Sequence, residues 1–151
     1  MGRIEFIYVF GMLVKVFATA YGYKYPSAII AMGLLESNYG LSLLSEKYHN
    51  YFGMKCGSTW QGGSVNMATK EEYTAGTLTS IRDNFRTYPS IYAGINGHFQ
   101  FLQYKRYANL KDATSPRDYL EKIRADGYCT STKYVDNCMK LIEQYALTDF
   151  D

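Results

Sequence analysis

Glu36 is the residue whose context best suits acid chemistry. It closes the apolar run 27–35, and Gly40 follows four residues later as a helix terminator. A helix that is apolar nearly all round is buried, so this carboxyl is expected at the edge of a hydrophobic wall, where loss of water raises its pKa. A carboxylic acid that keeps its proton can protonate the leaving oxygen of a glycoside. For an isolated glutamate, however, a solvated charge without a role is the commoner case.

The elements that must position Glu36 are mostly helices. Pro26 suits the first turn of the Glu36 helix, and Ser115-Pro116 caps another that stops at Gly127. Alternation over 64–88, with a turn at 73–76, predicts a β-hairpin. We expect an α+β fold in one domain, 1–151: a mostly helical lobe, a small hairpin lobe and a substrate groove between them. The predicted helices cover residues 4–21, 26–36, 41–48, 90–104, 115–127 and 132–147.

Composition narrows the classes of partner. The chain has 151 residues, a net charge of +2 and no run of five like charges, which argues against nucleic acid as a partner. Aromatic residues reach 17%, with 16 Tyr. Tyrosine joins a flat apolar face to a polar tip and therefore suits sugars as well as wet interfaces.

The first twenty residues resemble a signal peptide in part. Glu5 and Lys15 interrupt that pattern, and the apolar positions follow helical spacing instead. We interpret the segment as an amphipathic helix whose buried positions are expected at Ile4, Ile7, Tyr8, Gly11, Val14, Ala18 and Tyr21. It is expected to be too polar to span a membrane, so neither a secretion signal nor a membrane partner is predicted.

Cysteine and histidine give no catalytic pattern. The three cysteines show no metal spacing, and Cys129 and Cys138 pair only if the loop between them folds back. His98 is predicted to be a satisfied structural residue, and His49 a surface residue. No cofactor and no metal are expected.

Several segments resemble a known family in the right order. The matching segments, each with the family sequence that it resembles, are Leu35-Glu36-Ser37-Asn38-Tyr39-Gly40-Leu41-Ser42 with "LESGWGxS", Asn50-Tyr51-Phe52-Gly53-Met54-Lys55 with "NLFGIK", Val65 to Gly76 with "TxEYxxG", Phe85 to Ser90 with "FRxYxS", Arg106-Tyr107 with "RY", and Gly127 to Tyr134 with "GYATDPxY". From near Phe6 to Leu147 the chain therefore resembles the glycoside hydrolase family 73 type of peptidoglycan endo-β-N-acetylglucosaminidase, of the flagellar-rod and autolysin kinds.

The resemblance implies a lysozyme-like fold and hydrolysis of the β-1,4 bond from N-acetylglucosamine to N-acetylmuramic acid. It places the general acid on Glu36, the second carboxylate on Glu72 and an essential tyrosine on Tyr134. The expected substrate-binding residues, taken from the matched segments and from candidate sugar platforms, are Tyr39, Ser42, Asn50, Phe52, Lys55, Trp60 and Tyr107. The chain departs from the family pattern at Tyr39 (for Trp), His49 (for Asn), Cys129 (for Ala) and Ser131-Thr132-Lys133 (for Asp-Pro).

Two mechanisms follow from this assignment. Glu72 acts as base on a water, or the substrate's own acetamide attacks the anomeric carbon with help from Tyr134. Glu71 competes with Glu72, because adjacent strand residues face opposite sides.

Two other activities fit the same features: a lytic transglycosylase or muramidase, and a catalytically silent wall-binding module. We expect a monomer that acts at the bacterial cell wall, as a phage-delivered lysin or as a module of a longer secreted protein.

Overall fold

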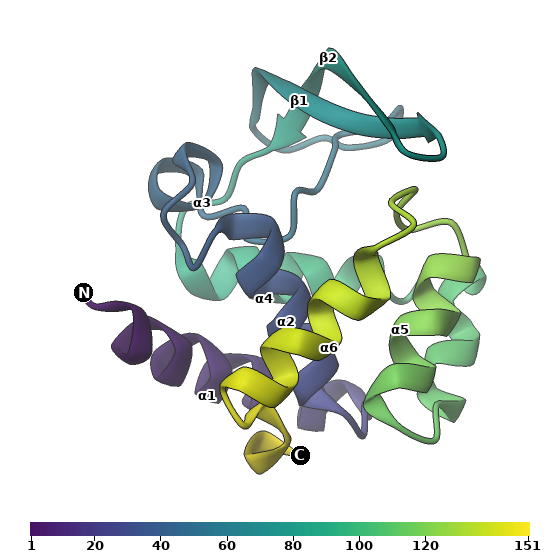
Figure 1. Ribbon diagram of the computed structural model, residues 1–151. Coiled ribbons are helices and arrows are strands. Elements are labelled where there is room, and N and C mark those ends of the chain that lie inside the picture. The colour runs from purple at the N-terminus through teal and green to yellow at the C-terminus, as the bar shows by residue number, and fades with distance from the viewer.

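Two lobes of unequal size make up the chain, with helices below and a two-stranded hairpin above (Figure 1). The computed structural model describes the backbone of residues 1–151 and the side chains of all but residues 71–73. The elements in chain order are α1 (Arg3–Tyr21), α2 (Pro26–Ser37), α3 (Leu43–Tyr48), β1 (Ser64–Thr74), β2 (Thr77–Arg86), α4 (Ile91–Phe101), the 3-10 helix η1 (Lys105–Asp112), α5 (Pro116–Ala125), α6 (Tyr134–Gln144) and the 3-10 helix η2 (Leu147–Phe150).

This arrangement confirms the expected α+β architecture. Each predicted helix and the hairpin is present, with ends that shift by a few residues. Two helices end three residues earlier than expected: the helix predicted over 90–104 ends at Phe101, and the last helix, predicted over 132–147, ends at Gln144. Ala146 adopts a left-handed φ of 50°, a conformation that a helix cannot continue through. The separate turn η2 therefore follows.

Helix α2 forms the centre of the larger lobe. Every residue from Pro26 to Leu34 is buried, as its apolar composition predicted. Helices α1 and α6 and the turn η2 pack around it. At Gly33 an added Cβ would come within 2.4 Å of the Phe10 ring, so a side chain there would push α1 away from the helix that carries Glu36.

Helix α1 corrects two expectations. Its buried residues are Ile7, Phe10, Gly11, Val14 and Ala18, whereas Ile4 and Tyr8, which were expected to be buried, are exposed. The expectation that the helix is too polar for a membrane was also wrong. By length and composition its 19 residues suffice to cross one, with a mean hydropathy of 1.6 and 28% of that window buried. The packing of Phe10 against Tyr51 and Phe52 nevertheless makes α1 part of the core.

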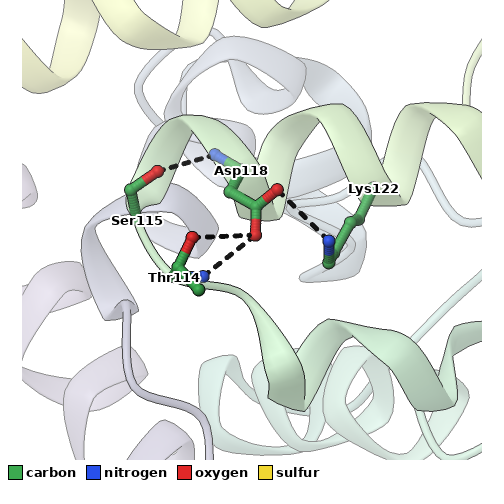
Figure 2. Close-up of polar contacts among 4 residues, drawn as sticks. All are labelled: Thr114, Ser115, Asp118 and Lys122. Carbon is green, nitrogen blue, oxygen red and sulfur yellow. Dashed lines mark hydrogen bonds and ion pairs between the residues drawn. The ribbon is translucent and has the colours of Figure 1, made fainter.

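Helix α5 begins with the predicted cap. The Ser115 hydroxyl accepts a hydrogen bond from the Asp118 amide at 3.0 Å, and the Asp118 carboxylate accepts one from the Thr114 amide at 2.9 Å (Figure 2). Lys122 lies 3.2 Å from the other carboxylate oxygen. The Thr114 amide is the main reason that the pKa of Asp118 is lowered. This reciprocal cap fixes where α5 starts, and with it the loop that leads on to Tyr134.

The hairpin is a regular antiparallel pair. Ser64 lies opposite Arg86, Thr74 opposite Thr77, and one register irregularity separates residue 71 from Thr74. Gly76 supplies the positive φ of the turn, 80°. At the base, the Cys56 amide donates to the Asn84 carbonyl at 2.8 Å and the Arg86 amide to the Met54 carbonyl at 2.9 Å. The hairpin is therefore joined to the segment that follows α3.

Candidate active site

A cleft of about 1060 Å³ lies between the two lobes. One side consists of Glu36 and the segments after α3 and before α6, and the hairpin contributes Met67 to Lys70 and Leu78. Figure 1 shows the loop between α5 and α6 rising toward the hairpin. The expected groove between the lobes is therefore present, and it brings together residues almost one hundred positions apart in the chain.

Glu36 lies in this cleft at the end of α2, with an environment that differs from the expected one. The helix before it is buried, but the Glu36 side chain itself is exposed. The expectation that the fold alone keeps water from this carboxyl was therefore wrong. Gly53 explains the opening: it has a φ of +64°, and a Cβ there would stand 3.0 Å from the Glu36 Oε2 atom. A glycine leaves this carboxyl space on its loop side.

Asn50 holds the loop that carries Gly53. Its side-chain amide donates to the carbonyls of Met54 at 2.9 Å and Arg86 at 2.8 Å, and its oxygen accepts from the Met54 amide at 3.0 Å. Asn50 is buried and is not among the residues that line the cleft. Where the sequence suggested substrate binding, the structure thus gives Asn50 the contacts of a positioning residue.

Phe52 forms part of the cleft wall and rests on a buried histidine. Its ring stacks on His98 with centroids 3.8 Å apart and planes 10° apart. Burial lowers the pKa of His98 to about 3, so the ring is neutral at physiological pH. Neither ring nitrogen has a hydrogen-bond partner in the part of the chain that the structure describes. His98 is structural as expected, but the expectation of a satisfied histidine was wrong.

Tyr134 meets the cleft from the first turn of α6. The residue is only 3% exposed, and its hydroxyl has no hydrogen-bond partner among the described residues. Burial raises its pKa well above the ordinary value, and the nearby Cys138 and Glu36 add to the shift. The phenol therefore keeps its proton and has a donor to offer.

Tyr128 stands beside Tyr134 on the same wall. Its hydroxyl donates to the Phe52 carbonyl at 3.2 Å. Burial raises its pKa, and the charge of Glu36 comes next among the causes. Tyr128 belongs to the matched segment 127–134, but the family resemblance gave it no role. Its contact with the Phe52 backbone ties the α5–α6 loop to the loop that faces Glu36.

Other predicted binding residues divide between the cleft and elsewhere. Ser42, Lys55 and Tyr107 line the cleft, although Tyr107 is buried and Ser42 also caps α3. Tyr39 does not line it. Its ring lies 3.9 Å from the Arg3 guanidinium and packs edge-on against Tyr145. Trp60 lines a smaller pocket beside the cleft.

Glu72 was predicted to be the second carboxylate, and its side chain lies outside the described residues, as does that of its rival Glu71. All three cysteines lie among the described residues and none is in a disulfide, so the conditional Cys129–Cys138 bond is not formed. No group of three or more His, Cys, Asp or Glu side chains suited to a metal ion occurs in the described part of the chain.

Positive charge lines the cleft, a feature that the sequence reasoning missed. Among the described lining residues Glu36 is the one carboxylate, against the four cations Lys55, Lys70, Arg86 and Arg106. Arg86 and Arg106 lie in matched segments, but the net charge of +2 gave no sign that cations gather on one surface. Among the described lining residues, cations therefore outnumber carboxylates, and one of these cations, Lys55, lies 3.7 Å from the Asp83 carboxylate.

Comparison with known proteins gives one family match. The family model described as "Glucosaminidase: Mannosyl-glycoprotein endo-beta-N-acetylglucosaminidase" matches residues 13–147. The exo-glucosaminidase LytG of Bacillus subtilis is 30% identical over 83% of this chain and 46% of its own length. A Lactococcus lactis protein named "Probable N-acetylmuramidase" is 33% identical over 84% of this chain and 30% of its own.

A solved structure extends the similarity to the fold. The catalytic domain of the autolysin Auto from Listeria monocytogenes superposes with a TM-score of 0.79 and 27% identity, covering 99% of this chain and 87% of that one. The chain spans less than half the length of the two relatives above. It is thus similar in sequence to parts of longer proteins, and in structure to one catalytic domain.

Proposed function

Because residues 13–147 match its model, the chain belongs to the glucosaminidase family, and we propose that it hydrolyses the β-1,4 bond between N-acetylglucosamine and N-acetylmuramic acid in peptidoglycan. The observation that carries this proposal is the placement of Glu36. Its carboxyl ends a buried helix and opens into a cleft between two lobes. A cleft between two lobes suits a polymer strand, and an acid on its wall suits attack on a bond within that strand.

Glu36 acts as the general acid in this proposal. It gives its proton to the glycosidic oxygen while the bond from that oxygen to the anomeric carbon of N-acetylglucosamine breaks. The exposed carboxyl loses water when a sugar covers it, and this loss favours the protonated form. Substrate binding thus supplies the desolvation that the fold alone does not provide.

The substrate's own acetamide then replaces the departing oxygen. Its carbonyl oxygen bonds to the anomeric carbon, and the Tyr134 hydroxyl orients the acetamide. Water afterwards opens the ring so formed and returns a proton to Glu36. One feature supports this route: the buried Tyr134 hydroxyl has no hydrogen-bond partner among the described residues. Substrate assistance is a known exception to the two-carboxylate scheme.

Glu72 would take part differently in the alternative mechanism, as a base on a water that attacks the far face of the sugar. The family resemblance is the support for this role. A hairpin residue can reach the site when the substrate brings the lobes together. In the substrate-assisted route, the acetamide is the nucleophile and Glu36 accepts the proton from water. Replacing Glu72 should then cost less activity than replacing Glu36.

Which bond is cut can be read from the products. One relative is named an exo-glucosaminidase and another a probable N-acetylmuramidase. The sequence similarity is therefore compatible with cleavage on either side of N-acetylmuramic acid. Peptidoglycan digested with this protein and reduced with borohydride should carry reduced N-acetylglucosamine ends by mass spectrometry. Reduced muramic ends, or anhydromuramic ends, would instead identify a muramidase or a lytic transglycosylase.

A silent wall-binding module is the proposal's competitor outside enzymes. A zymogram with purified peptidoglycan separates the two, because a binder leaves no cleared band. The proposal also places the protein at the bacterial cell wall. Clearing by the wild type, and none by Glu36→Gln, is the expected result.

A further inference from the structure

A second, smaller pocket of about 240 Å³ continues from the cleft at the base of the hairpin. Trp60, Gly97 and Gln100 line this pocket and not the cleft; Trp60 comes from the loop before β1, and the other two come from α4. The walls that it shares with the cleft are Thr59, Arg86, Phe101 and Tyr104. Because four residues border both spaces, a group attached to a strand in the cleft can enter the pocket.

Trp60 is held in a fixed position although its loop is polar. Its indole nitrogen donates to the Gly63 carbonyl at 2.8 Å, and Tyr88 packs against the ring with centroids 5.6 Å apart. A Cβ at Gly62 would come within 2.4 Å of the indole, so the loop closes tightly over one edge of it. The ring is therefore a preformed wall that needs no ordering when a ligand arrives.

Arg86 places a buried cation between the cleft and the pocket. The residue is 8% exposed. Its guanidinium carbon lies 4.6 Å from the Trp60 ring centre and 5.4 Å from that of Phe101, and its Nε donates to the Lys55 carbonyl at 2.9 Å. No carboxylate forms an ion pair with Arg86 within the described side chains. A buried charge without a counter-charge is costly, and an anionic ligand relieves that cost.

The rest of the cleft favours the same kind of ligand. Lys70 and Arg106 add positive charge along its wall. In peptidoglycan the glycan backbone consists of N-acetyl sugars, and the carboxylates are carried by the peptide stems attached to muramic acid. A positively charged lining therefore matches the peptide stems rather than the sugars between them.

We propose that the pocket formed by Trp60, Arg86, Gln100 and Tyr104 binds a carboxylate-bearing peptide stem of the strand held in the cleft. The inference rests on the proposed function, since the strand must occupy the cleft for its stem to reach the pocket. It assigns Trp60 a contact with the stem in place of the sugar-stacking role expected from the sequence. The protein thereby prefers glycan with acidic stems over glycan without them.

Gln100 offers a test that leaves Arg86 intact. Gln100 is exposed on α4, so Gln100→Glu and Gln100→Lys alter the charge of the pocket without disturbing the core. Gln144→Glu, on the exposed side of α6 outside both pockets, introduces the same charge as a matched control. The two substrates are peptide-bearing glycan with free stem carboxylates, and the same glycan after those carboxylates are converted to neutral amides.

We expect Gln100→Glu to lower kcat/KM on the free-carboxylate glycan about two- to fivefold, and Gln100→Lys to raise it, chiefly through KM. On the amidated glycan Gln100→Glu should cause no loss. Raising the salt concentration should shrink the difference between the variants. Trp60→Ala should raise KM on the free-carboxylate glycan with kcat unchanged, while Tyr92→Ala, an exposed tyrosine of α4 outside the pocket, should not.

Equal kinetics of both Gln100 variants and the wild type on the free-carboxylate glycan would overturn the inference. So would the same Gln100→Glu loss on both substrates. Hydrolysis of the amidated glycan by the wild type separates this result from a failure of the proposed function. If the wild type hydrolyses neither substrate, the proposed enzymatic activity is contradicted, and so is the stem site that depends on it.

Discussion

The helical lobe and the hairpin are built on different principles. Helix α2 is buried from Pro26 to Leu34, whereas Thr77 to Ser80 of β2 are exposed and only Phe85 and Arg86 at its base are buried. Segments that bury little apolar surface open at low free-energy cost, and buried helices do not. The comparison indicates that Glu36 lies on the rigid side of the cleft, while the hairpin on the other side can adjust.

This division suits a glycosidase that cuts a polymer. In the proposed mechanism, a fixed Glu36 keeps the proton donor aligned with the bond, and an adjustable hairpin lets a long strand enter before the cleft closes. The expected effects are therefore largest for changes on the helical side.

Glu36→Gln should give the largest loss, at least about a thousandfold in kcat, because the amide cannot deliver a proton to the leaving oxygen. Single-turnover rates on purified glycan strands measure this effect directly. The thermal midpoint should hardly move, since the side chain is exposed. A rate within tenfold of the wild type would remove Glu36 from the chemistry.

Tyr134→Phe should lower kcat about a hundredfold, because in the proposed mechanism the Tyr134 hydroxyl orients the acetamide. The same change should leave stability unchanged or raised, because it removes a buried hydroxyl that lacks a partner. Tyr119→Phe is the matched control: its hydroxyl is also buried without a partner, and it lies outside the cleft. Activity lost in both variants would argue for a packing effect.

Gly53→Ala should lower kcat about tenfold by displacing the carboxyl of Glu36, because the new Cβ stands 3.0 Å from Oε2. The positive φ adds backbone strain of about 1–2 kcal/mol. Gly22→Ala serves as control, since it has a φ of +89° and open space around the Cβ. Equal activity loss in the two variants would show that strain, and not the contact with Glu36, is responsible.

His98 should make the helical lobe sensitive to acid. Its pKa is lowered to about 3 from 6.5 by burial, so the neutral ring contributes stability that is fully present above pH 6.5 and is lost as the pH falls toward 3. Between pH 7 and pH 5 this amounts to about 2 kcal/mol of the unfolding free energy. Urea unfolding at the two pH values measures it.

His98→Phe should remove that dependence, whereas His49→Asn should keep it. His49 adopts a φ of 55°, a conformation that asparagine tolerates, so the control is mild. If His98→Phe loses as much stability between pH 7 and pH 5 as the wild type does, other groups cause the acid sensitivity.

Much of this architecture could be predicted from local patterns. The buried helix ending at Glu36 follows from an apolar run with a proline at its start, and the hairpin follows from alternation and Gly76. Both depend on nearest neighbours in the chain, which a sequence displays directly. The segment resemblance supplied the proposed roles of Glu36, Glu72 and Tyr134.

The environments of single side chains could not be predicted in this way. Tyr39 contacts Arg3 and Tyr145, which lie 36 and 106 positions away in the chain. Asn50 donates a hydrogen bond to the backbone carbonyl of Arg86. The exposure of Glu36 depends on a glycine in another loop. These are tertiary contacts, and periodicity carries no information about them.

The leaving group provides the most direct test of the central claim that Glu36 donates the proton from the rigid lobe. Glu36→Gln and Glu72→Gln should be assayed on a natural glycan and on the corresponding nitrophenyl glycoside. The nitrophenyl group leaves as nitrophenolate, which needs no proton. The rate deficit of Glu36→Gln should nearly vanish with nitrophenolate, whereas the smaller deficit of Glu72→Gln should not change. If Glu36→Gln is equally impaired with both leaving groups, Glu36 is not the general acid.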